Sequence, residues 1–412
     1  MTLRVFVAAG VAAALAGGVR AAPLTYDAAL DLAGHTAPGL EAAASELNAA
    51  RAAAIAAGRL PDPKLSLGVN NFPISGPLAG RPDLDNFSML TLDYSQDVPN
   101  GAKRRAGRAL AGAAISRAEA GRRLERRQVR IAAALAWIDL YFAERRLAAL
   151  DQIERALAPL RSAAPAQLAS GAERPAQTIE PQQLTAALAD RRADLVAQVA
   201  KARAQLGRWV EGGQADEPAG EPPNPPIDPV ALRAGLDDLP DLQVKTAAIG
   251  QAKADASLAQ ADKQPDWGYG VGYSHRDPRF GDYVSAKVTF SLPLFAATRQ
   301  DPLIAAKLAD VNRADLERVQ MRRDLAAALE SDLADHVMHH ERLARARQSL
   351  VPLADRRAQL EAASYAGGEA SLADVLTAYL ALAEARIDLI DREADVVRDG
   401  ARIVLTYGSD AQ

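Results

Sequence analysis

A strand-like pattern changes abruptly into a long helical pattern at two places in this sequence. Apolar and polar residues alternate from Phe87 to Asp97, the alternation stops at Pro99-Asn100-Gly101, and a long, charged, Ala-rich stretch follows. The same change occurs after Tyr283 to Leu292, where the alternation breaks at Pro293. A period of two is typical of a half-buried strand and a period near 3.6 of a helix. The chain therefore makes the same strand-to-helix transition twice.

The spacing of these transitions indicates an internal duplication. Aligning Pro99 with Pro293 gives an offset of 194 residues, whereas aligning Pro61 with Pro265 gives 204. The first copy thus has about ten extra residues between its two strands. A chain of 412 residues has room for two or three separate domains, but the repeat favours one body built from two similar halves.

The composition favours long helices over a thick globular core. Hydrophobic residues make up 49% of the chain, yet aromatic residues make up only 5% and alanine is abundant. Alanine is the strongest helix former, and helices lined with it pack closely. A helix of roughly 60 residues is about 90 Å long, which is too long for a compact domain.

We predict a mainly helical fold with a small β part, arranged as two strand-strand-long-helix repeats. The first repeat covers residues 23–210, with strands at about 64–72 and 87–97 and helices at about 25–58, 102–160 and 179–210. The helix at 25–58 is expected to break near Gly34 to Pro38. The second covers 231–408, with strands at about 267–275 and 282–292 and helices at about 240–262, 298–358 and 371–407. Residues 211–230 are rich in proline and predict a semi-rigid outer linker.

The apolar spacing of the two return helices predicts how they pack. In the last helix, two rows repeat every seven residues: Val375, Leu382, Leu389, Val396 and Ile403, and Leu376, Ala383, Ile390, Val397 and Val404. Such a repeat is typical of a coiled-coil seam. Between 184 and 210 the spacing is eleven, with rows Leu184, Leu195, Leu206 and Leu188, Val199, Val210. Eleven-residue repeats straighten or reverse the supercoil, so these helices suit the wall of a wide cylinder.

The N-terminal residues predict export. Residues 1–22 combine Arg4 with an apolar run and a small-residue end, as in a signal peptide cleaved near Ala21 or Ala22. Without this segment, 46 basic and 52 acidic residues remain, which gives no support for a nucleic-acid partner. The chain has no cysteine, so we expect no disulfide, no thiolate metal site and no lipid anchor.

The strands are the candidate membrane segment. No apolar run after the leader approaches the roughly 18 residues of a spanning helix. The four strands have about the nine to eleven residues of a tilted membrane strand, and the scarce aromatic residues cluster in them. Four strands cannot close a barrel, because about eight is the smallest workable number. Several chains would have to share one barrel; a soluble four-stranded sheet is the alternative.

One segment resembles a known family. Tyr365-Ala-Gly-Gly-Glu-Ala-Ser-Leu-Ala-Asp-Val-Leu-Thr-Ala-Tyr379, followed by Ala385-Arg386, is similar to the turn motif that opens the final helix of the TolC-type outer-membrane efflux factors. The repeat order and the leader agree with this resemblance over nearly the whole chain. Residues 57–67 are also similar to the heavy-metal branch, which includes CzcC and CusC.

The resemblance implies a homotrimer in the outer membrane with an extension into the periplasm. Each protomer would give four strands to a twelve-stranded β-barrel in outer-membrane lipid and its helices to a periplasmic α-barrel. A periplasmic adaptor and an inner-membrane pump, of the RND type, would open the closed tip. Asp374 would line the gate, and Gly171, Tyr365 and Gly368 would form the tip turns that contact the adaptor. No cofactor is implied.

The chain departs from this family's pattern at the tip. Thr377 stands where a second aspartate is expected, and Ala370 where a basic latch residue is expected. In the first copy, Arg174-Pro175 and Glu180-Pro181 interrupt the expected helix. Asp374 also lies in the first turn of a helix opened by Ser371, so a capping role competes with a gate role.

Two further clusters are candidates for other chemistry. His336, His339 and His340, beside Asp335, have the i, i+3, i+4 spacing that can present imidazoles to a metal ion, or they form a solvated helix face. A stripe of arginines would line a conduit or form a solvated face with Glu119 and Glu125. The stripe consists of Arg122, Arg123, Arg126, Arg127 and Arg130. We find no nucleophile elbow, phosphate loop or zinc-protease motif, and predict no enzyme.

The sequence therefore predicts the passive outer-membrane channel of a tripartite efflux system for small solutes, with heavy-metal cations as candidates. The runner-up is a soluble periplasmic coiled-coil scaffold or adaptor. A third hypothesis, weaker than both, is a periplasmic metal-binding protein built on the three histidines.

Overall fold

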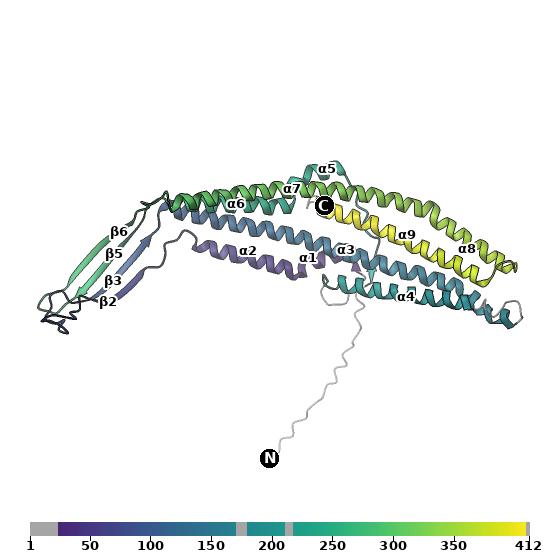
Figure 1. The fold of residues 1–412 in the computed structure, drawn as a ribbon, viewed down its shortest axis with the longest axis horizontal. Coiled ribbons are helices and arrows are strands. Elements are labelled where there is room, and N and C mark those ends of the chain that lie inside the picture. Colours follow the sequence, from purple (N-terminus) through teal and green to yellow (C-terminus); the bar gives the residue numbers. More distant parts are fainter. Residues whose placement is uncertain (1–23, 170–178, 211–216, 409–412) are drawn as a thin grey trace, which may run out of the picture.

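The protein is elongated, with a β-sheet at one end and long helices over the rest of its length (Figure 1). This computed structural model describes residues 24–169, 179–210 and 217–408. The predicted leader, 1–22, lies outside the described residues. In both repeats the chain first runs to the sheet, then continues as a long helix to the opposite end and returns toward the middle, so the duplicated transitions lie side by side (Figure 1).

The sheet is built from one hairpin of each repeat. Its strands are β2 (Lys64–Asn70), β3 (Met89–Val98), β5 (Asp266–His275) and β6 (Tyr283–Ser291). All neighbours are antiparallel, in the order β2-β3-β5-β6, and the two hairpins join where β3 pairs with β5. The register aligns Tyr94 with Val271 and Leu92 with Tyr273. The four strands thus lie where the alternation predicts them, but β2 is shorter than expected.

The helices of the first repeat are α1 (Tyr26–Thr36), α2 (Pro38–Ala56), α3 (Gly101–Ala169) and α4 (Ile179–Leu206). The helix at 25–58 is broken within the expected segment, since Ala37 is extended and Pro38 starts a new helix at its first position. Helix α3 is longer than expected. The Arg174-Pro175 interruption lies outside the described residues.

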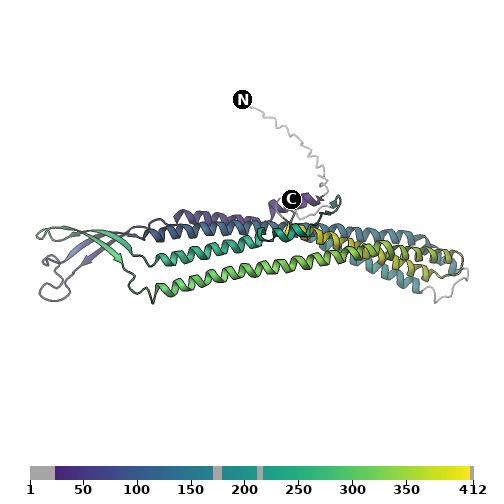
Figure 2. The ribbon, with the colours of Figure 1, turned by 90° about the horizontal axis from the view of Figure 1, so that it is seen from above.

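The helices of the second repeat are α5 (Pro229–Ala234), α6 (Pro240–Ala261), α7 (Gln300–Arg345), α8 (Val351–Ala366) and α9 (Leu372–Tyr407). A short 3₁₀ turn, Gly235–Asp238, joins α5 to α6. Near the sheet, α2, α3, α6 and α7 lie next to one another in one layer (Figure 2). Toward the far end, α3 continues, and the neighbouring helices become α4 on one side and α9, followed by α8, on the other (Figure 1).

The two long helices differ in one respect. Helix α3 is continuous over 69 residues, whereas a wide π-helical turn, η3 (Ala346–Leu350), separates α7 from α8. There the amide of Val351 bonds to the carbonyl of Ala346, five residues back. Pro352 follows at once; it has no amide donor, and its ring crowds the carbonyl four residues earlier. Widening the preceding turn relieves that crowding. The predicted helix at 298–358 is therefore interrupted, and it extends to Ala366.

The linker prediction needs a correction. Within its described part, Pro218–Ala219 form strand β4, which pairs in parallel with β1 (Leu24–Thr25). The amide of Leu24 also donates to the carbonyl of Glu217 at 3.2 Å. The linker is therefore hydrogen-bonded to the start of the described chain. A strand of two residues is too short to show a periodicity in the sequence, so this pairing was not predicted.

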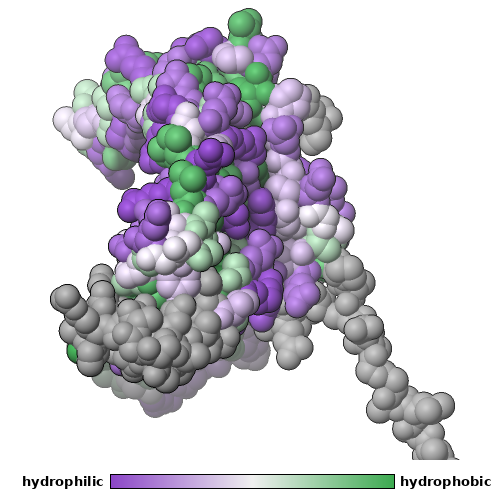
Figure 3. All heavy atoms as spheres, turned by 90° about the vertical axis from the view of Figure 1, so that its right-hand side faces the viewer, coloured by the Kyte–Doolittle hydropathy of each residue, from purple (hydrophilic) through white to green (hydrophobic). Residues whose placement is uncertain are grey.

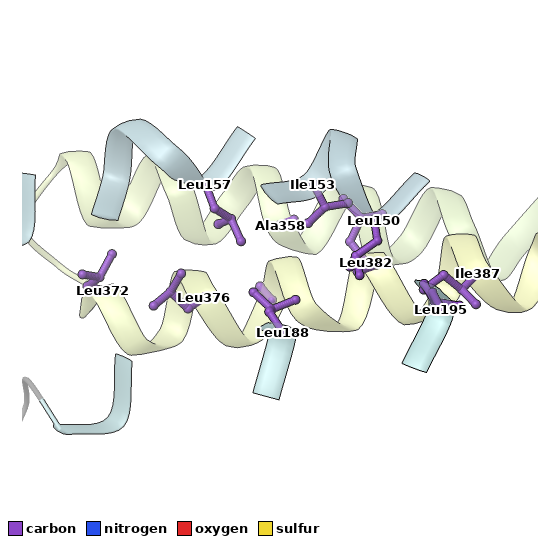
Figure 4. Packing of buried hydrophobic residues seen from close by; sticks show 12 residues of the cluster. Leu150, Ile153, Leu157, Leu188, Leu195, Ala358, Leu372, Leu376, Leu382 and Ile387 are labelled. Atoms are coloured by element: carbon purple, nitrogen blue, oxygen red, sulfur yellow. The ribbon is translucent and has the colours of Figure 1, made fainter. Parts of the chain in front are cut away.

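The core lies along the helix seams in two main clusters. Near the middle of the molecule, Trp137 is fully buried, donates from Nε1 to the carbonyl of Leu24 at 2.8 Å, and stacks on Tyr141. Toward the far end, apolar side chains of α3, α4, α8 and α9 meet (Figure 4). Leu376 and Leu382 of the seven-residue rows and Leu188 and Leu195 of the eleven-residue rows belong to this second cluster.

Candidate functional site

The sheet has one apolar face, and that face is exposed. Along β5, the side chains of Trp267, Tyr269, Val271 and Tyr273 are exposed, while the small residues between them are buried. Leu67 on β2 and Val284 on β6 lie on the same face and are 71% and 69% exposed. A soluble sheet buries its apolar face and exposes the other. This sheet leaves its apolar face exposed, as expected of strands that face lipid.

The opposite face of the sheet carries small and polar residues. The register places Ser66, Asp93, Gly272 and Ser285 in one row across the four strands. The next row of this face holds Lys64, Ser95, Gly270 and Lys287. A polar face opposite an exposed apolar face is the pattern of a strand between lipid and water.

Asn100 fixes the junction between sheet and helices. Its side-chain oxygen accepts from the amide of Lys103 at 2.8 Å, which caps α3. Its side-chain amide donates to the carbonyl of Gln264 and to Oδ1 of Asp266, at 3.1 and 2.9 Å. The first repeat's helix start is thereby bonded to the second repeat's strand start. The break at Pro99-Asn100-Gly101 was predictable from the sequence, but the role of Asn100 was not predicted; an asparagine just before a helix was the available signal.

At the far end, a tight turn joins α8 to α9. Gly368 has φ +78°, a backbone region that favours glycine, and its amide donates to the carbonyl of Tyr365 at 3.0 Å. Tyr365 packs against the far core cluster. The candidate tip residues Tyr365 and Gly368 therefore lie in one turn, at the end opposite the sheet. Gly171, the third candidate, lies outside the described residues.

Asp374 takes part in a helix cap and is also exposed. The amide of Asp374 donates to the Ser371 hydroxyl at 3.2 Å, and the Asp374 carboxylate accepts from the amide of Ser371 at 2.9 Å. These reciprocal bonds form a capping box. Hydrogen bonds from the hydroxyl and then the amide of Ser371 lower the pKa of Asp374. The carboxylate is thus held ionised at the surface of the tip, beside the exposed Thr377.

The surface at this end is mainly hydrophilic, with small apolar groups between the polar ones (Figure 3). Ion pairs link neighbouring helices here. Arg386 of α9 lies 3.2 Å from Asp355 of α8, and Arg192 of α4 lies 3.2 Å from Asp151 of α3. An ion pair therefore links α9 to α8 in the second repeat and α4 to α3 in the first.

The three candidate histidines do not converge on one point. His339 Nδ1 lies 2.5 Å from Asp399 Oδ2, whereas His336 and His340 face each other with their Nε2 atoms 3.1 Å apart. Burial lowers the pKa of His336, and the positive charge of a protonated His340 nearby lowers it further. Among the described residues, no three His, Cys, Asp or Glu side chains are arranged to hold a metal ion.

The arginine stripe divides into two parts. Arg122, Arg123 and Arg126 are exposed, as a solvated face requires. Arg127 is instead buried; it pairs with Asp241 of α6 and donates to the carbonyl of Thr406 at 2.9 Å. A buried arginine needs such partners because desolvating its charge is costly. Arg127 therefore joins three helices, which sequence reasoning missed because its partners are far along the chain.

Residues 233–409 match the family model described as "Outer membrane efflux protein". No curated protein matches the chain by sequence. Among solved structures, the Campylobacter jejuni CmeC outer membrane channel is similar with a TM-score of 0.79 at 13% identity, covering 93% of this chain and 85% of that one. The outer membrane protein VceC of Vibrio cholerae gives 0.74 at 17% identity, covering 94% and 97%. CusC gives 0.74 at 16%, covering 93% and 92%.

The second repeat therefore matches the outer membrane efflux protein family, and the predicted resemblance to the TolC-type efflux factors is confirmed. The predicted fold class and the class of function, an outer-membrane efflux component, are confirmed as well. The soluble scaffold is not favoured. Within the described residues, no helix is both long enough and apolar enough to span a membrane.

Proposed function

We propose that three copies of this chain form a passive outer-membrane channel. The exposed apolar face of the sheet is the observation that carries this proposal. In the described residues, β2 and β6 are edge strands, each paired on one side only. Unpaired edges are not tolerated in lipid, and four strands do not close a barrel. Joining β6 of one protomer to β2 of the next removes both edges, and three protomers give twelve strands.

The helices are suited to form a helical barrel that continues the β-barrel. Helix α7 lies at one side of the helix layer (Figure 2). Leu303, Leu308 and Leu316 of α7 are 64%, 49% and 59% exposed, which leaves large apolar side chains for a neighbouring protomer to cover. We propose that the helices extend into the periplasm, and that residues 1–22 are removed during export. N-terminal sequencing of the mature protein tests the second statement.

The tip is the proposed contact with the rest of the efflux system. We propose that the turn at Tyr365 and Gly368, with its counterpart at Gly171, contacts a periplasmic adaptor, and that an inner-membrane pump of the RND type supplies the energy. Three exposed Asp374 carboxylates around one axis would attract cations. The capping box does not exclude this role, because it uses the carboxylate without burying it.

The exported solutes are a separate question. The likeness of residues 57–67 to the heavy-metal branch makes heavy-metal cations the first solutes to test. Deletion of the gene should then sensitise cells to those cations, and the wild-type gene should restore export.

Conductance tests the channel itself. Purified protein is added to a planar lipid bilayer and the current is recorded. We expect discrete, long-lived conductance steps that require the strands, so that a variant lacking residues 266–291 gives none. Protein that reaches the bilayer intact but never produces steps would contradict the proposed function.

A further inference from the structure

We propose that Asp93 and Lys287 form the charged ring of the β-barrel lumen that sets its ion selectivity, and that glycines of β5 hold both side chains flat against the wall. This inference rests on the proposed trimeric channel, because it assigns the polar face of the sheet to the lumen.

The glycines of β5 make room for side chains of the strands on either side. Gly268, Gly270 and Gly272 all lie on the polar face and are buried. A Cβ added at Gly272 would lie 2.3 Å from Oδ1 of Asp93 and 2.9 Å from Oγ of Ser285. Real Cβ atoms essentially never come so close to another heavy atom. The Asp93 carboxylate therefore occupies the space that any other residue at 272 would fill.

Lys287 uses the next glycine in the same way. A Cβ at Gly270 would lie 2.9 Å from Cε and 3.3 Å from Cγ of Lys287. The lysine stem thus crosses β5 against the sheet instead of pointing away from it. Gly68 of β2, also on the polar face, shows the contrast, because a Cβ there would meet only Oγ1 of Thr91 at 3.7 Å, an ordinary contact.

The two charges of this ring are not neutralised within their own chain. In the described parts of the protein, neither Asp93 nor Lys287 makes an ion pair or a side-chain hydrogen bond. Lys64 and Asp97, also on the polar face, are instead paired at 2.7 Å. Asp93 and Lys287 are on adjacent rows of the sheet, since Asp93 pairs with Gly272 and Lys287 with Gly270.

In a trimer this level of the lumen would hold three carboxylates and three ammonium groups. Fixed charges on a pore wall select permeant ions by sign. With equal numbers of both, we expect weak selectivity in the wild-type channel. Because Gly270 and Gly272 have no side chains, Lys287 and Asp93 can lie flat along the wall of the barrel. The charged side chains therefore do not narrow the lumen.

Reversal potentials across a salt gradient test the charges. The recordings use planar bilayers and a KCl gradient with the dilute side at about 0.1 M, where the Debye length is about 10 Å. We expect Lys287→Gln to favour cations and Asp93→Asn to favour anions. Each substitution should change the ratio of K⁺ to Cl⁻ permeability by about twofold or more. Removing a fixed charge changes the local electrostatic potential, and a change of one kT in that potential alters the local ion concentration about threefold. Lys64→Gln with Asp97→Asn, which removes the neutral pair, is the matched control and should leave the ratio unchanged.

Conductance tests the role of the glycines. Gly272→Ala should displace the Asp93 carboxylate into the lumen and lower the single-channel conductance, whereas Gly68→Ala should not. Adding Asp93→Ala to Gly272→Ala should restore the conductance, which a folding defect at Gly272 would not allow. Conducting wild-type channels with unchanged reversal potentials in both charge variants would overturn this inference alone. A wild-type protein that never conducts would overturn the proposed function on which it rests.

Discussion

Replacing Val271 with arginine should prevent stable insertion of the sheet. Val271 lies at the centre of β5, between Tyr94 and Ala286, and is 49% exposed on the apolar face. In the proposed barrel its side chain faces the middle of the lipid. An arginine there costs about 2–4 kcal/mol in transmembrane barrels. That corresponds to a roughly 30- to 1000-fold loss in the folding equilibrium for each protomer.

The assay is a urea titration of protein folded into phosphatidylcholine vesicles, followed by tryptophan fluorescence, with Trp267 on the same strand as a reporter. Ser285→Arg is the matched control. Ser285 is also exposed and near the middle of its strand, but on the polar face. We expect it to change the free energy of unfolding by less than about 0.5 kcal/mol, as for an ordinary surface substitution. Equal effects of Val271→Arg and Ser285→Arg would refute the assignment of the two faces.

Four further substitutions test the helical part. Trp137→Ala should lower the free energy of unfolding by about 3–5 kcal/mol, because it empties a fully buried site; thermal denaturation in detergent measures this, and a loss below about 1 kcal/mol would contradict the buried position. Asn100→Ala should cost about 2–4 kcal/mol, from one lost helix cap and carbonyls left without a donor, and an unchanged melting temperature would contradict its role at the junction. Ser371→Ala should cost about 1 kcal/mol at pH 7 by removing the cap of α9. Because the folded pKa of Asp374 is below its usual 3.8, the carboxylate stabilises the fold above that pH and this contribution disappears as the pH falls through the lowered pKa. Asp374→Asn should therefore lower the melting temperature at pH 7, and this effect should disappear as the pH falls well below 3.8; an equal effect at both extremes would contradict the sign of the shift.

The repeat architecture was predictable because it rests on local patterns. Alternation located the strands, and proline located their ends. The seven-residue rows of α9 correspond to side chains that pack in the core, among them Val375, Leu382 and Ile403. Periodicity predicts the buried residues of α9 because this helix packs against neighbouring helices along its length, so residues at a regular spacing are buried throughout.

Contacts between distant residues were not predictable. The pairing of Arg127 with Asp241 joins helices of different repeats, and nothing near either residue indicates it. The split of the histidines is similar, since His339 turns to Asp399 only because α9 lies beside α7. The small strand β4 inside the linker depends on pairing with β1. These features arise from the packing of helices and strands against one another, whereas a sequence pattern reports only one element.

The glycines of β5 show a site that sequence reasoning passed over for another reason. The alternation of Trp267, Tyr269, Val271 and Tyr273 predicts a strand, but it assigns no role to the glycines between them. The role of Gly272 depends on Asp93 and that of Gly270 on Lys287, and both charged residues come from the neighbouring strands. Only the register of the sheet brings these four residues together.

The native mass of the protein extracted from the outer-membrane fraction tests the central claim most directly. The measurement is made by native mass spectrometry or by light scattering in detergent, with the detergent's contribution subtracted. We predict an assembly of three chains that remains in solution only with detergent. A monomer or dimer recovered from the soluble periplasmic fraction would contradict the shared barrel, and with it the channel.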